Sequence, residues 1–437
     1  MRYFNVILFE WKHFIKSPFK IIGVVLFIIS GVYGLHNGAN LYTKQNNEIN
    51  KLNQKAELEK KTILGFYDNN QKGPLTRPWV DITKPLWAIR NVPTYHYKKP
   101  SPNIVYSTGQ TEQYGFYKKI GLYSSPYDAD MTKEIANPER IQFGALDFSF
   151  TILYLLPLLL LILLYDIKGS EAEQGFLPLI LVQTGVKQWW MLSRVTFYVI
   201  LSMIIILVLM FYGSTLTEVF KTPLTFWNIF FWIILYLFLW VTIYFIILYF
   251  GKNTISNTFQ MMGLWLMFSF IIPASIYQWI SIEQPVNLMT NIIDTKRGKK
   301  DQIYKELAST SDIELLQLYP KLKQTERTIT TANIKNLRAN SKIAFANVAL
   351  KTAITNAETN NLRRNKLISK TYGINPLTFF QAKLNQLTST DYNSYKTYRD
   401  DIQQLIDIRI NTLISDTWNT TKINKTKYID YNKSLHK

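Results

Sequence analysis

Residues 195–217 read VTFYVILSMIIILVLMFYGSTLT and contain no charged side chain. A helix of about 20 such residues spans the roughly 30 Å hydrocarbon core of a bilayer. Four further stretches are equally free of Asp, Glu, Lys and Arg: residues 21–43, 148–165, 222–251 and 253–282. Five such stretches are too many to be the buried helices of a soluble core. The sequence therefore predicts an all-α polytopic membrane protein with about five transmembrane helices.

These spans divide the chain into segments that alternate between the two sides of the membrane. In chain order we expect an interfacial elbow helix (1–19), a first span (20–42), a first extracytoplasmic domain (43–147), a second span (148–165), a cytoplasmic loop (166–190), a third span (191–213), a short external loop (214–225), a fourth span (226–250), a short cytoplasmic loop (251–257), a fifth span (258–281) and a second extracytoplasmic domain (282–437).

The first 20 residues read MRYFNVILFEWKHFIKSPFK, and their apolar side chains alternate with charged ones. This pattern is typical of a helix that lies in the membrane interface. Glu10, Trp11 and Lys12 belong to this elbow, and Pro18 turns the chain into the first span. The first apolar run has no small-residue cleavage site and is longer than the core of a signal peptide. We therefore expect it to remain as an anchor.

The two large segments differ in character. Apolar positions 49, 52, 56 and 63 follow helical spacing, so a polar helix is expected to continue outward from the first span. Residues 67–147 are rich in proline and tyrosine, which favours an irregular or strand-containing domain. The second segment is polar and helix-compatible, with neither Gly nor Pro between Pro320 and Gly373. That stretch is either one long helix or a bent pair broken near Asn360.

Lysine and arginine in the short loops set the orientation, because cytoplasmic loops carry an excess of these residues. Four basic residues flank the start of the first span, and others lie between spans two and three and between spans four and five: Arg2, Lys12, Lys16, Lys20, Lys168, Lys187, Arg194 and Lys252. The opposite short loop balances Glu218 against Lys221. The N-terminus is therefore predicted to be cytoplasmic and the C-terminus extracytoplasmic. The rival topology is inverted, with both large domains in the cytosol.

Composition excludes several classes of function. The chain has 437 residues and no cysteine, which excludes disulfides and thiolate chemistry. Its net charge is +19, but the basic residues are scattered, so we expect no nucleic-acid partner. The four histidines are far apart, and no phosphate-binding loop occurs, so neither a metal site nor ATP hydrolysis is expected in this chain. A membrane enzyme acting on lipid-linked sugars would need clustered carboxylates or histidines, which the sequence lacks.

The spans carry no ionisable residue in their middle, which argues against an ion-coupled transporter. Polar residues that could line a path are Asn228, Tyr244, Asn257 and Gln260. Hydrogen bonding between helices is the simpler account of each. The Tyr- and Trp-rich tract 77–100 could stack on sugars or pack a small domain on the membrane. The basic helices of 284–437 could bind anionic glycans or form a solvated face.

The loop after the second span reads DIKGSEAEQGFLPLILVQTG (166–185). It interrupts two apolar runs with acidic residues and a glycine: Asp166, Glu171, Glu173 and Gly175, followed by Leu177. Acidic residues near the start of a helix are stabilised by its dipole, so a capped interfacial helix is one interpretation. The other is a docking loop that receives force from a cytoplasmic motor protein.

The pattern Glu171-Ala172-Glu173-Gln174-Gly175-Phe176-Leu177 resembles the E-x-E-x-G-T-L loop of ABC-2 type transporter permeases, with Phe176 in place of the usual threonine. FEWKHFIKSPF before the first span is similar to the elbow of that family. Residues 137–166 and 373–395 resemble a bacterial branch with two large extracytoplasmic insertions. Many members of the family have six spans, whereas five are counted here.

The resemblance implies a permease subunit of an ATP-driven exporter in the bacterial inner membrane. Two permease subunits, identical or related, would bind two separate ATPase subunits that hold ATP and Mg²⁺, and this chain would hold no cofactor. The loop 166–190 would couple the ATPase to the spans through Asp166, Glu171, Glu173, Gly175 and Leu177. Glu171 and Glu173 would meet polar or basic groups on the ATPase, and Gly175 would permit a close turn. The extracytoplasmic domains would receive cargo or meet a periplasmic partner. The alternative is a membrane-anchored scaffold or sensor that transports nothing.

Overall fold

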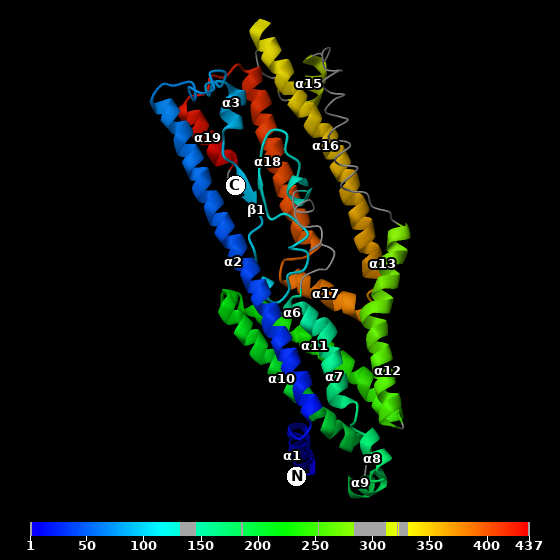
Figure 1. Ribbon diagram of the computed structural model, residues 1–437. Coiled ribbons are helices and arrows are strands. Elements are labelled where there is room, and N and C mark those ends of the chain that lie inside the picture. Colours follow the sequence, from blue (N-terminus) through cyan, green and yellow to red (C-terminus); the bar gives the residue numbers. More distant parts are fainter. Residues whose placement is uncertain are drawn as a thin grey trace.

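The computed structural model describes residues 2–131, 146–184, 187–251, 253–283, 312–320, 322 and 331–435. Within these residues the chain is mostly helical and elongated (Figure 1). Long apolar helices gather around the N-terminal end, and a second group of helices extends beyond them. We call this second group, with the residues of 43–131 and 312–435 that it contains, the distal domain. Lys252, the predicted stretch 137–145 and most of 284–330 lie outside the described residues.

Four helices are long and apolar enough to cross a membrane: α2 (Pro18–Asp68), α10 (Lys187–Leu216), α11 (Pro223–Phe250) and the continuous run of α12 (Thr254–Leu266), η4 (Met267–Ile271) and α13 (Ile272–Glu283). A shorter apolar helix lies among them, formed by α6 (Phe148–Phe150), the π-helical turn η2 (Thr151–Leu155) and α7 (Leu156–Leu164). The predicted all-α membrane protein is confirmed at this level.

Two carbonyls of the shorter apolar helix near Pro157 accept hydrogen bonds from side chains of neighbouring helices. Pro157 has no N–H, so it cannot donate to the carbonyl of Leu153 as a helical residue four positions later would. The Tyr236 hydroxyl, from α11, donates to that carbonyl over 2.6 Å instead. The indole N–H of Trp265, from α12, donates to the neighbouring Tyr154 carbonyl over 2.9 Å. A proline in a membrane helix is thereby accommodated without leaving a carbonyl unbonded.

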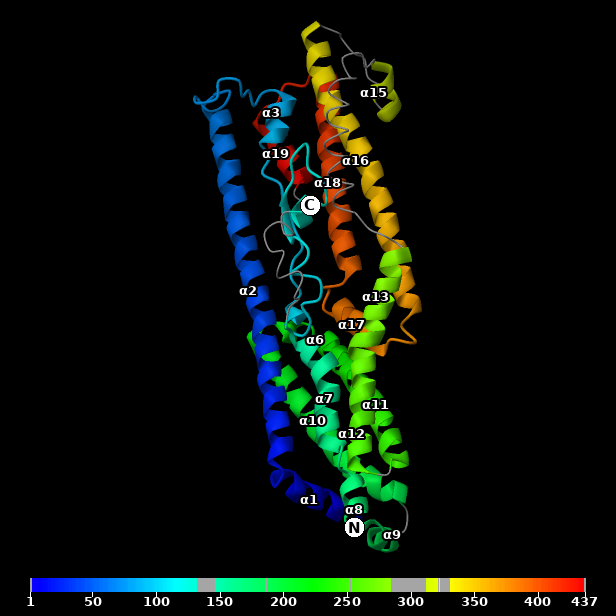
Figure 2. The same ribbon diagram turned by 45° about the vertical axis from the view of Figure 1, so that its right-hand side comes forward.

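Helix α2 is the longest element in the described chain. Its 51 residues correspond to about 76 Å at 1.5 Å per residue. Two glycines allow close packing, since a Cβ on Gly34 would lie 2.5 Å from backbone atoms of Asp147 and Phe148, and one on Gly38 would lie 2.8 Å from Val105. The predicted outward polar helix is confirmed, and it continues the first span without interruption into the distal domain (Figure 2).

The distal domain combines one small mixed segment with long helices. The mixed segment holds α3 (Pro85–Arg90), η1 (Pro102–Val105) and an antiparallel pair, β1 (Tyr95–Tyr97) and β2 (Tyr117–Lys119), in the register Tyr95↔Lys119. The helices are α15 (Asp312–Leu318), α16 (Thr331–Lys370), α17 (Pro376–Leu387), α18 (Tyr392–Trp418) and α19 (Lys425–Leu435). Helix α16 passes Asn360 unbroken, so the single-helix alternative is the correct one.

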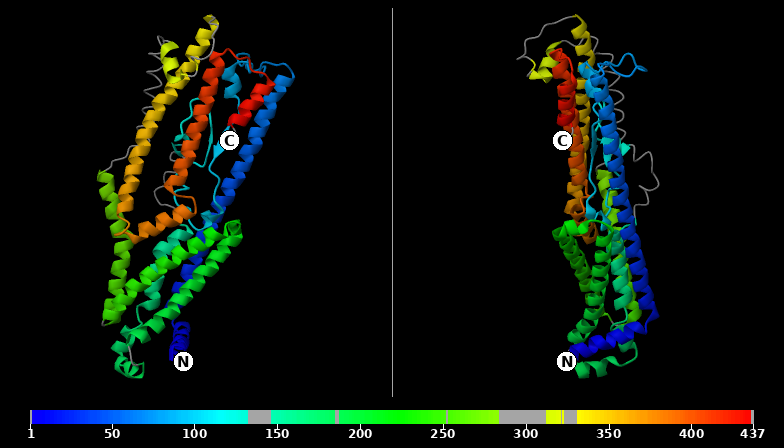
Figure 3. Two further views of the ribbon diagram at one scale, coloured as in Figure 1. Left: turned by 180° about the vertical axis from the view of Figure 1, so that it is seen from behind. Right: turned by 90° about the vertical axis from the view of Figure 1, so that its left-hand side faces the viewer.

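The mixed segment and the long helices share one core. Ile89 and Ile120 pack with Ile402, Ile406 and other residues of α18 in a single buried cluster. Arg409 of α18 lies inside this cluster and donates hydrogen bonds to the carbonyls of Ile89 (2.7 Å), Val92 (2.6 Å) and Ile120. Burial lowers the pKa of Arg409 to about 10. Segments from the two halves of the sequence therefore lie together between α2 and α16, as the view from behind shows (Figure 3).

Candidate functional site

The loop after α7 lies at the end of the molecule opposite the distal domain (Figures 1 and 2). It forms two short helices, α8 (Gly169–Glu173) and α9 (Leu177–Thr184). Gly175 ends α8 with a φ of +77°, a conformation that favours glycine. The N–H of Phe176 donates to the Glu171 carbonyl over 3.0 Å across this turn. Gly175 therefore makes the close turn that the sequence predicts.

The first half of the loop joins a buried cluster of charges that we call the ionic node: Glu10, Lys20, Asp166, Glu171 and Arg194, with the hydroxyl of Tyr198. Lys20 donates to Asp166 over 2.8 Å and to the Tyr198 hydroxyl over 2.9 Å. The same hydroxyl donates to Glu10 over 2.9 Å.

Arg194 completes the ionic node. Its guanidinium donates from Nε to Glu10 and from Nη1 to Glu171. The node thereby connects α1 (Arg2–Ile15), α2, the loop, α8 and α10. Glu10 and Lys20 are almost completely buried. Buried charges are tolerated only when they are paired and hydrogen-bonded, and the removal of one partner leaves the others uncompensated.

Two other residues of the same stretch, Lys168 and Glu173, bind the other pair of helices. Lys168 donates to the carbonyls of Tyr249 (3.1 Å) and Gly251, at the C-terminal end of α11. Glu173 accepts from the backbone N–H of Thr254 over 2.7 Å, at the first residue of α12. A cation at a helix C-terminus and an anion at an N-terminus both match the helix dipoles.

Gly169 allows α8 to approach α12 closely. A Cβ at this position would lie 2.1 Å from the Thr254 hydroxyl and 2.5 Å from the Thr254 nitrogen. Residues 166–173 therefore contact every long apolar helix, α2 and α10 through the ionic node and α11 and α12 through Lys168, Gly169 and Glu173. A displacement of this loop would therefore change its contacts with all four long apolar helices.

The acidic residues of the loop have internal partners. Asp166, Glu171 and Glu173 were expected to be coupling residues, with Glu171 and Glu173 facing an ATPase. In the structure Asp166 and Glu171 are in the ionic node, and Glu173 is exposed and caps α12. Leu177 packs against the core of the apolar helices.

The elbow residues divide between the node and the surface. Glu10 is a member of the node. Trp11 is exposed, with its ring edge-on to Phe197 at 6.2 Å, and Lys12 is exposed. Pro18 occupies the first turn of α2, where its missing N–H costs nothing.

The four predicted path-lining residues are not brought together. Asn228 is exposed near the start of α11, whereas Asn257 is buried near the start of α12, at the opposite end of the spans. Tyr244 donates to the carbonyl of Pro157 over 3.1 Å, and Gln260 donates to Ser256 over 3.2 Å on an exposed face. Hydrogen bonding between or within helices accounts for Tyr244 and Gln260.

The described exposed residues of α9 are apolar. Leu177 and Ile180 pack toward the core, so α9 turns other residues outward. Leu179 is 63% exposed and Val182 is 86% exposed, beside the exposed ring of Phe176. We call Phe176, Leu179 and Val182 the tip surface. Apolar side chains gathered at the end of a molecule mark a contact with a partner or with the membrane interface.

From the sequence, Lys20, Lys168 and Arg194 were expected only to indicate the orientation of the chain in the membrane. In the structure they are the basic partners of the loop. Their position next to uncharged stretches was the available signal, because a buried cation at the edge of a span needs a carboxylate or a carbonyl. Pairing over 146 residues between Lys20 and Asp166 cannot be read from spacing along the chain.

A second charged cluster lies in the distal domain. Arg399 of α18 donates to Glu358 of α16 over 2.9 Å and lies 3.6 Å from Asp130. Tyr127 and Tyr392 donate their hydroxyls to Glu358. Burial raises the pKa of Asp130 to about 6, although Arg399 opposes this shift. Burial would also raise the pKa of Glu358, but Arg399 and the two hydroxyls lower it overall.

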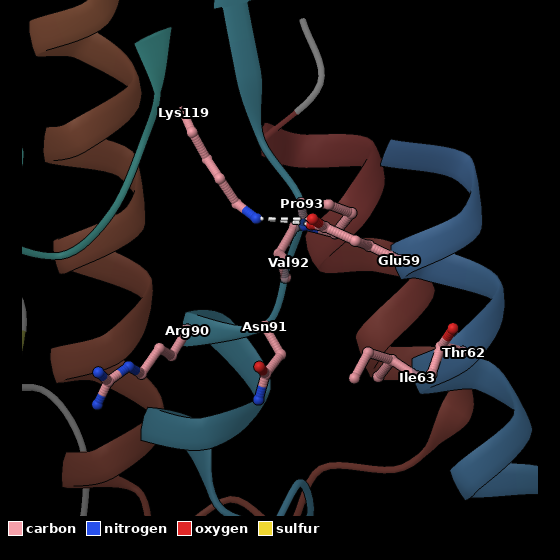
Figure 4. Close-up of a pocket in the computed structure, with 8 residues that line it drawn as sticks. All are labelled: Glu59, Thr62, Ile63, Arg90, Asn91, Val92, Pro93 and Lys119. Atoms are coloured by element: carbon pink, nitrogen blue, oxygen red, sulfur yellow. Dashed lines mark hydrogen bonds and ion pairs between the residues drawn. The ribbon is translucent and has the colours of Figure 1, made fainter. Parts of the chain in front are cut away.

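The distal domain also holds shallow polar pockets. One, of about 260 Å³, lies between α2, α3 and β2 (Figure 4). Across it Lys119 reaches Glu59 over 2.7 Å, while the Arg90 guanidinium points away from this pair and lies 5.3 Å from the Trp87 ring. In the part of the chain that the structure describes, no group of three or more His, Cys, Asp or Glu side chains could hold a metal ion.

No family model, no curated protein and no solved structure matches this chain.

Proposed function

We propose that this chain is the membrane-spanning subunit of an ATP-driven transporter of the ABC-2 permease type. In this proposal the four long apolar helices and the shorter helix 148–164 make five spans, with the N-terminus in the cytoplasm of a bacterium and the distal domain outside its inner membrane. The proposal rests on the contacts of the loop 166–184. This loop is bonded to every long apolar helix and it ends in an exposed apolar surface.

In this proposal the residues of the loop that contact the ATPase differ from those expected from the sequence. The tip surface of Phe176, Leu179 and Val182 docks on a separate ATPase subunit, because these side chains are free to be covered. Glu171 and Glu173 pass the displacement inward, because they bond Arg194 and the start of α12. This is allosteric coupling, in which ATP binding on the partner favours one arrangement of the spans.

Helix α2 extends the coupling to the other side of the membrane. It begins beside the ionic node at Lys20 and ends at Asp68, which pairs with Lys425 of α19 over 2.5 Å. Along its outer half, Glu59 bonds Lys119 of β2, and the Tyr67 hydroxyl donates to the Ile82 carbonyl over 2.6 Å. A rigid helix fixed at both ends transmits a tilt or a shift from the node to the distal domain.

The remaining parts of the proposal follow from the family resemblance. ATP and Mg²⁺ are held by the ATPase, and this chain is not itself an enzyme. A second permease subunit, identical or related, completes the transport unit. The distal domain receives the cargo for export or meets a periplasmic partner. The rival function is a membrane-anchored scaffold or sensor, which would need no ATPase.

Affinity purification in mild detergent tests the proposal. The chain is compared with Leu179→Asp/Val182→Asp, which places two charges on the tip surface without touching the ionic node. The matched control is Leu75→Asp, since Leu75 is 90% exposed in the distal domain. We expect an ATPase to co-purify with the chain and with the control, and to be lost from the tip variant. If no ATPase accompanies the folded chain, the scaffold is the better account.

A further inference from the structure

A run of basic residues lies at the end of α16. Between Glu358 and Asp391 the chain contains no Asp or Glu. The same stretch contains five Lys and Arg: Arg363, Arg364, Lys366, Lys370 and Lys383. Four of them fall in the last turns of α16, and we call Arg363, Arg364, Lys366 and Lys370 the basic patch. Arg363, Lys366 and Lys370 are exposed, and Arg364 is half-buried.

The basic patch lies beside the point where the apolar helices leave the membrane. The Arg364 guanidinium stands 5.2 Å from the centre of the Tyr277 ring on α13. Directly after the patch, α17 packs on α11, with the Phe380 ring 6.0 Å from Trp232. Figures 1 and 2 both show the end of α16 beside α13 and next to α17, at the boundary between the apolar helices and the distal domain.

Helix length places this boundary at the level of lipid headgroups. The run of α12 and η4, from Thr254 to Ile271, corresponds to about 27 Å at 1.5 Å per residue, close to the roughly 30 Å of a hydrocarbon core. Tyr277 lies about 9 Å beyond Ile271 at the same rise. Tyr277 is 63% exposed and Trp279 is 50% exposed. Exposed Tyr and Trp just beyond an apolar span mark the membrane interface.

The patch has little opposing charge from the elements packed against it. Glu358, the acidic residue before it on α16, is bonded to Arg399. Glu283 is at the far end of α13, six residues beyond Tyr277. At this depth the groups that face exposed cations are lipid phosphates, and each nearby Lys or Arg adds about 1 kcal/mol of attraction to an anionic surface.

We propose that the basic patch binds the phosphate headgroups of anionic phospholipids in the leaflet next to the distal domain. Arg364 holds α16 against α13, and Arg363, Lys366 and Lys370 supply charge to the headgroups. A position beside interfacial aromatic rings places a cation within reach of lipid headgroups. A cation that contacts only water would be no more stable at this depth than elsewhere on the surface. The inference depends on membrane insertion of the apolar helices and not on transport or on the orientation of the chain.

Fluorescence transfer in vesicles tests this binding. Because the chain has no cysteine, Ile374→Cys, which lies just beyond the patch and is 66% exposed in the natural chain, accepts a single donor dye. The full chain is reconstituted in phosphatidylcholine vesicles that contain a trace of acceptor-labelled phosphatidylglycerol or acceptor-labelled phosphatidylcholine. We expect transfer to phosphatidylglycerol to exceed transfer to phosphatidylcholine by at least about threefold. In Arg363→Gln/Lys366→Gln/Lys370→Gln the two should become equal, with Arg364 kept to preserve the helix contact.

Two controls distinguish lipid binding from other effects. The variant Lys51→Gln/Lys55→Gln/Lys61→Gln removes three exposed cations from α2 beyond the membrane and should leave the enrichment unchanged. Inorganic phosphate, added at constant ionic strength, should not displace the labelled lipid. The proposal is overturned if phosphatidylglycerol is not enriched, if the patch variant retains the enrichment, if the α2 variant loses it equally, or if inorganic phosphate abolishes it.

Discussion

The two buried charge clusters of this protein differ in how completely their charges are satisfied. In the ionic node, Glu10 accepts from both Arg194 and Tyr198, and Lys20 donates to both Asp166 and Tyr198. In the distal cluster, Arg399 bonds Glu358, but two of its guanidinium nitrogens make no hydrogen bond. One of them, Nη1, lies 3.6 Å from the Asp130 oxygen that also makes none.

The ionic node holds helices together, whereas the distal cluster contains a carboxylate whose charge changes with pH. A fully bonded cluster at the meeting point of α1, α2, α8 and α10 holds these helices in one arrangement, as transmission of force requires. A buried carboxylate with an unbonded oxygen is easier to protonate than one whose oxygens are both hydrogen-bonded. Protonation of that oxygen removes the charge without breaking a hydrogen bond. The node should therefore respond strongly to mutation, whereas the distal cluster should respond to pH.

The largest effect is expected from Arg194→Met. It leaves Glu10 buried without a cation, which should destabilise the folded chain by about 3–5 kcal/mol. The measurement is the melting temperature of the purified protein in detergent. Glu10→Gln/Arg194→Met should recover part of the loss, because it removes the uncompensated carboxylate. Equal melting of Arg194→Met and the natural chain would show that the node does not hold the helices.

Asp130→Asn tests the distal cluster. The folded-state pKa of Asp130 is raised from 3.8 to about 6, so folding favours its protonated form. The stability that this group contributes is fully present below pH 3.8 and is lost as pH rises through about 6, at most about 3 kcal/mol.

Melting curves between pH 4 and pH 7 measure this effect, because the loss runs between the two pKa values of 3.8 and about 6. The natural chain should lose stability as the pH rises across that range, and Asp130→Asn should flatten the profile. Asp68→Asn removes an exposed carboxylate outside the cluster and serves as the control. An unchanged profile in Asp130→Asn would contradict the assignment.

Removal of one hydroxyl from each cluster should destabilise the protein by different amounts. Tyr198→Phe deprives both Lys20 and Glu10 of a hydrogen bond, whereas Tyr392→Phe deprives only Glu358, which keeps Tyr127 and Arg399. We expect losses of about 2 kcal/mol for Tyr198→Phe and about 1 kcal/mol for Tyr392→Phe in melting experiments. The reverse order would mean that the node tolerates an unbonded charge better than the distal cluster does.

The smallest effect is expected from an exposed ion pair. Lys396 and Asp400 are one helical turn apart on α18 at 2.5 Å. Exposed pairs of this kind contribute about 0.5 kcal/mol or less, so Lys396→Met should melt within error of the natural chain. A loss comparable to that of Arg194→Met would show that burial does not decide the strength of these contacts.

Periodicity along the chain was sufficient to predict the helices but not their partners. The uncharged stretches predicted the long apolar helices, and helical spacing beyond Thr43 predicted the outward continuation of α2. The close turn at Gly175 was also expected from the family resemblance, and its φ of +77° is one that favours glycine. These features are determined by residues that are close together in the sequence.

The partners of the loop could not be predicted in the same way. Glu171 and Glu173 are acidic residues in a polar loop, which is equally compatible with a surface that faces a partner. Their actual contacts, Arg194 and the start of α12, are fixed by how α8 packs between helices that are distant in the sequence. The π-helical turn before Pro157 likewise depends on Tyr236, which is 79 residues later.

In the proposed mechanism, a nucleotide-dependent movement at the tip surface reaches the distal domain through α2. The most direct test is the distance between spin labels on Leu58→Cys of α2 and Val348→Cys of α16, two exposed positions in a protein that has no other cysteine. In the complex with its ATPase, we predict that a non-hydrolysable ATP analogue shifts this distance distribution. Asn47→Pro, which interrupts α2 beyond the membrane, should abolish the shift. An unchanged distribution while the ATPase is bound and occupied by nucleotide would contradict the account.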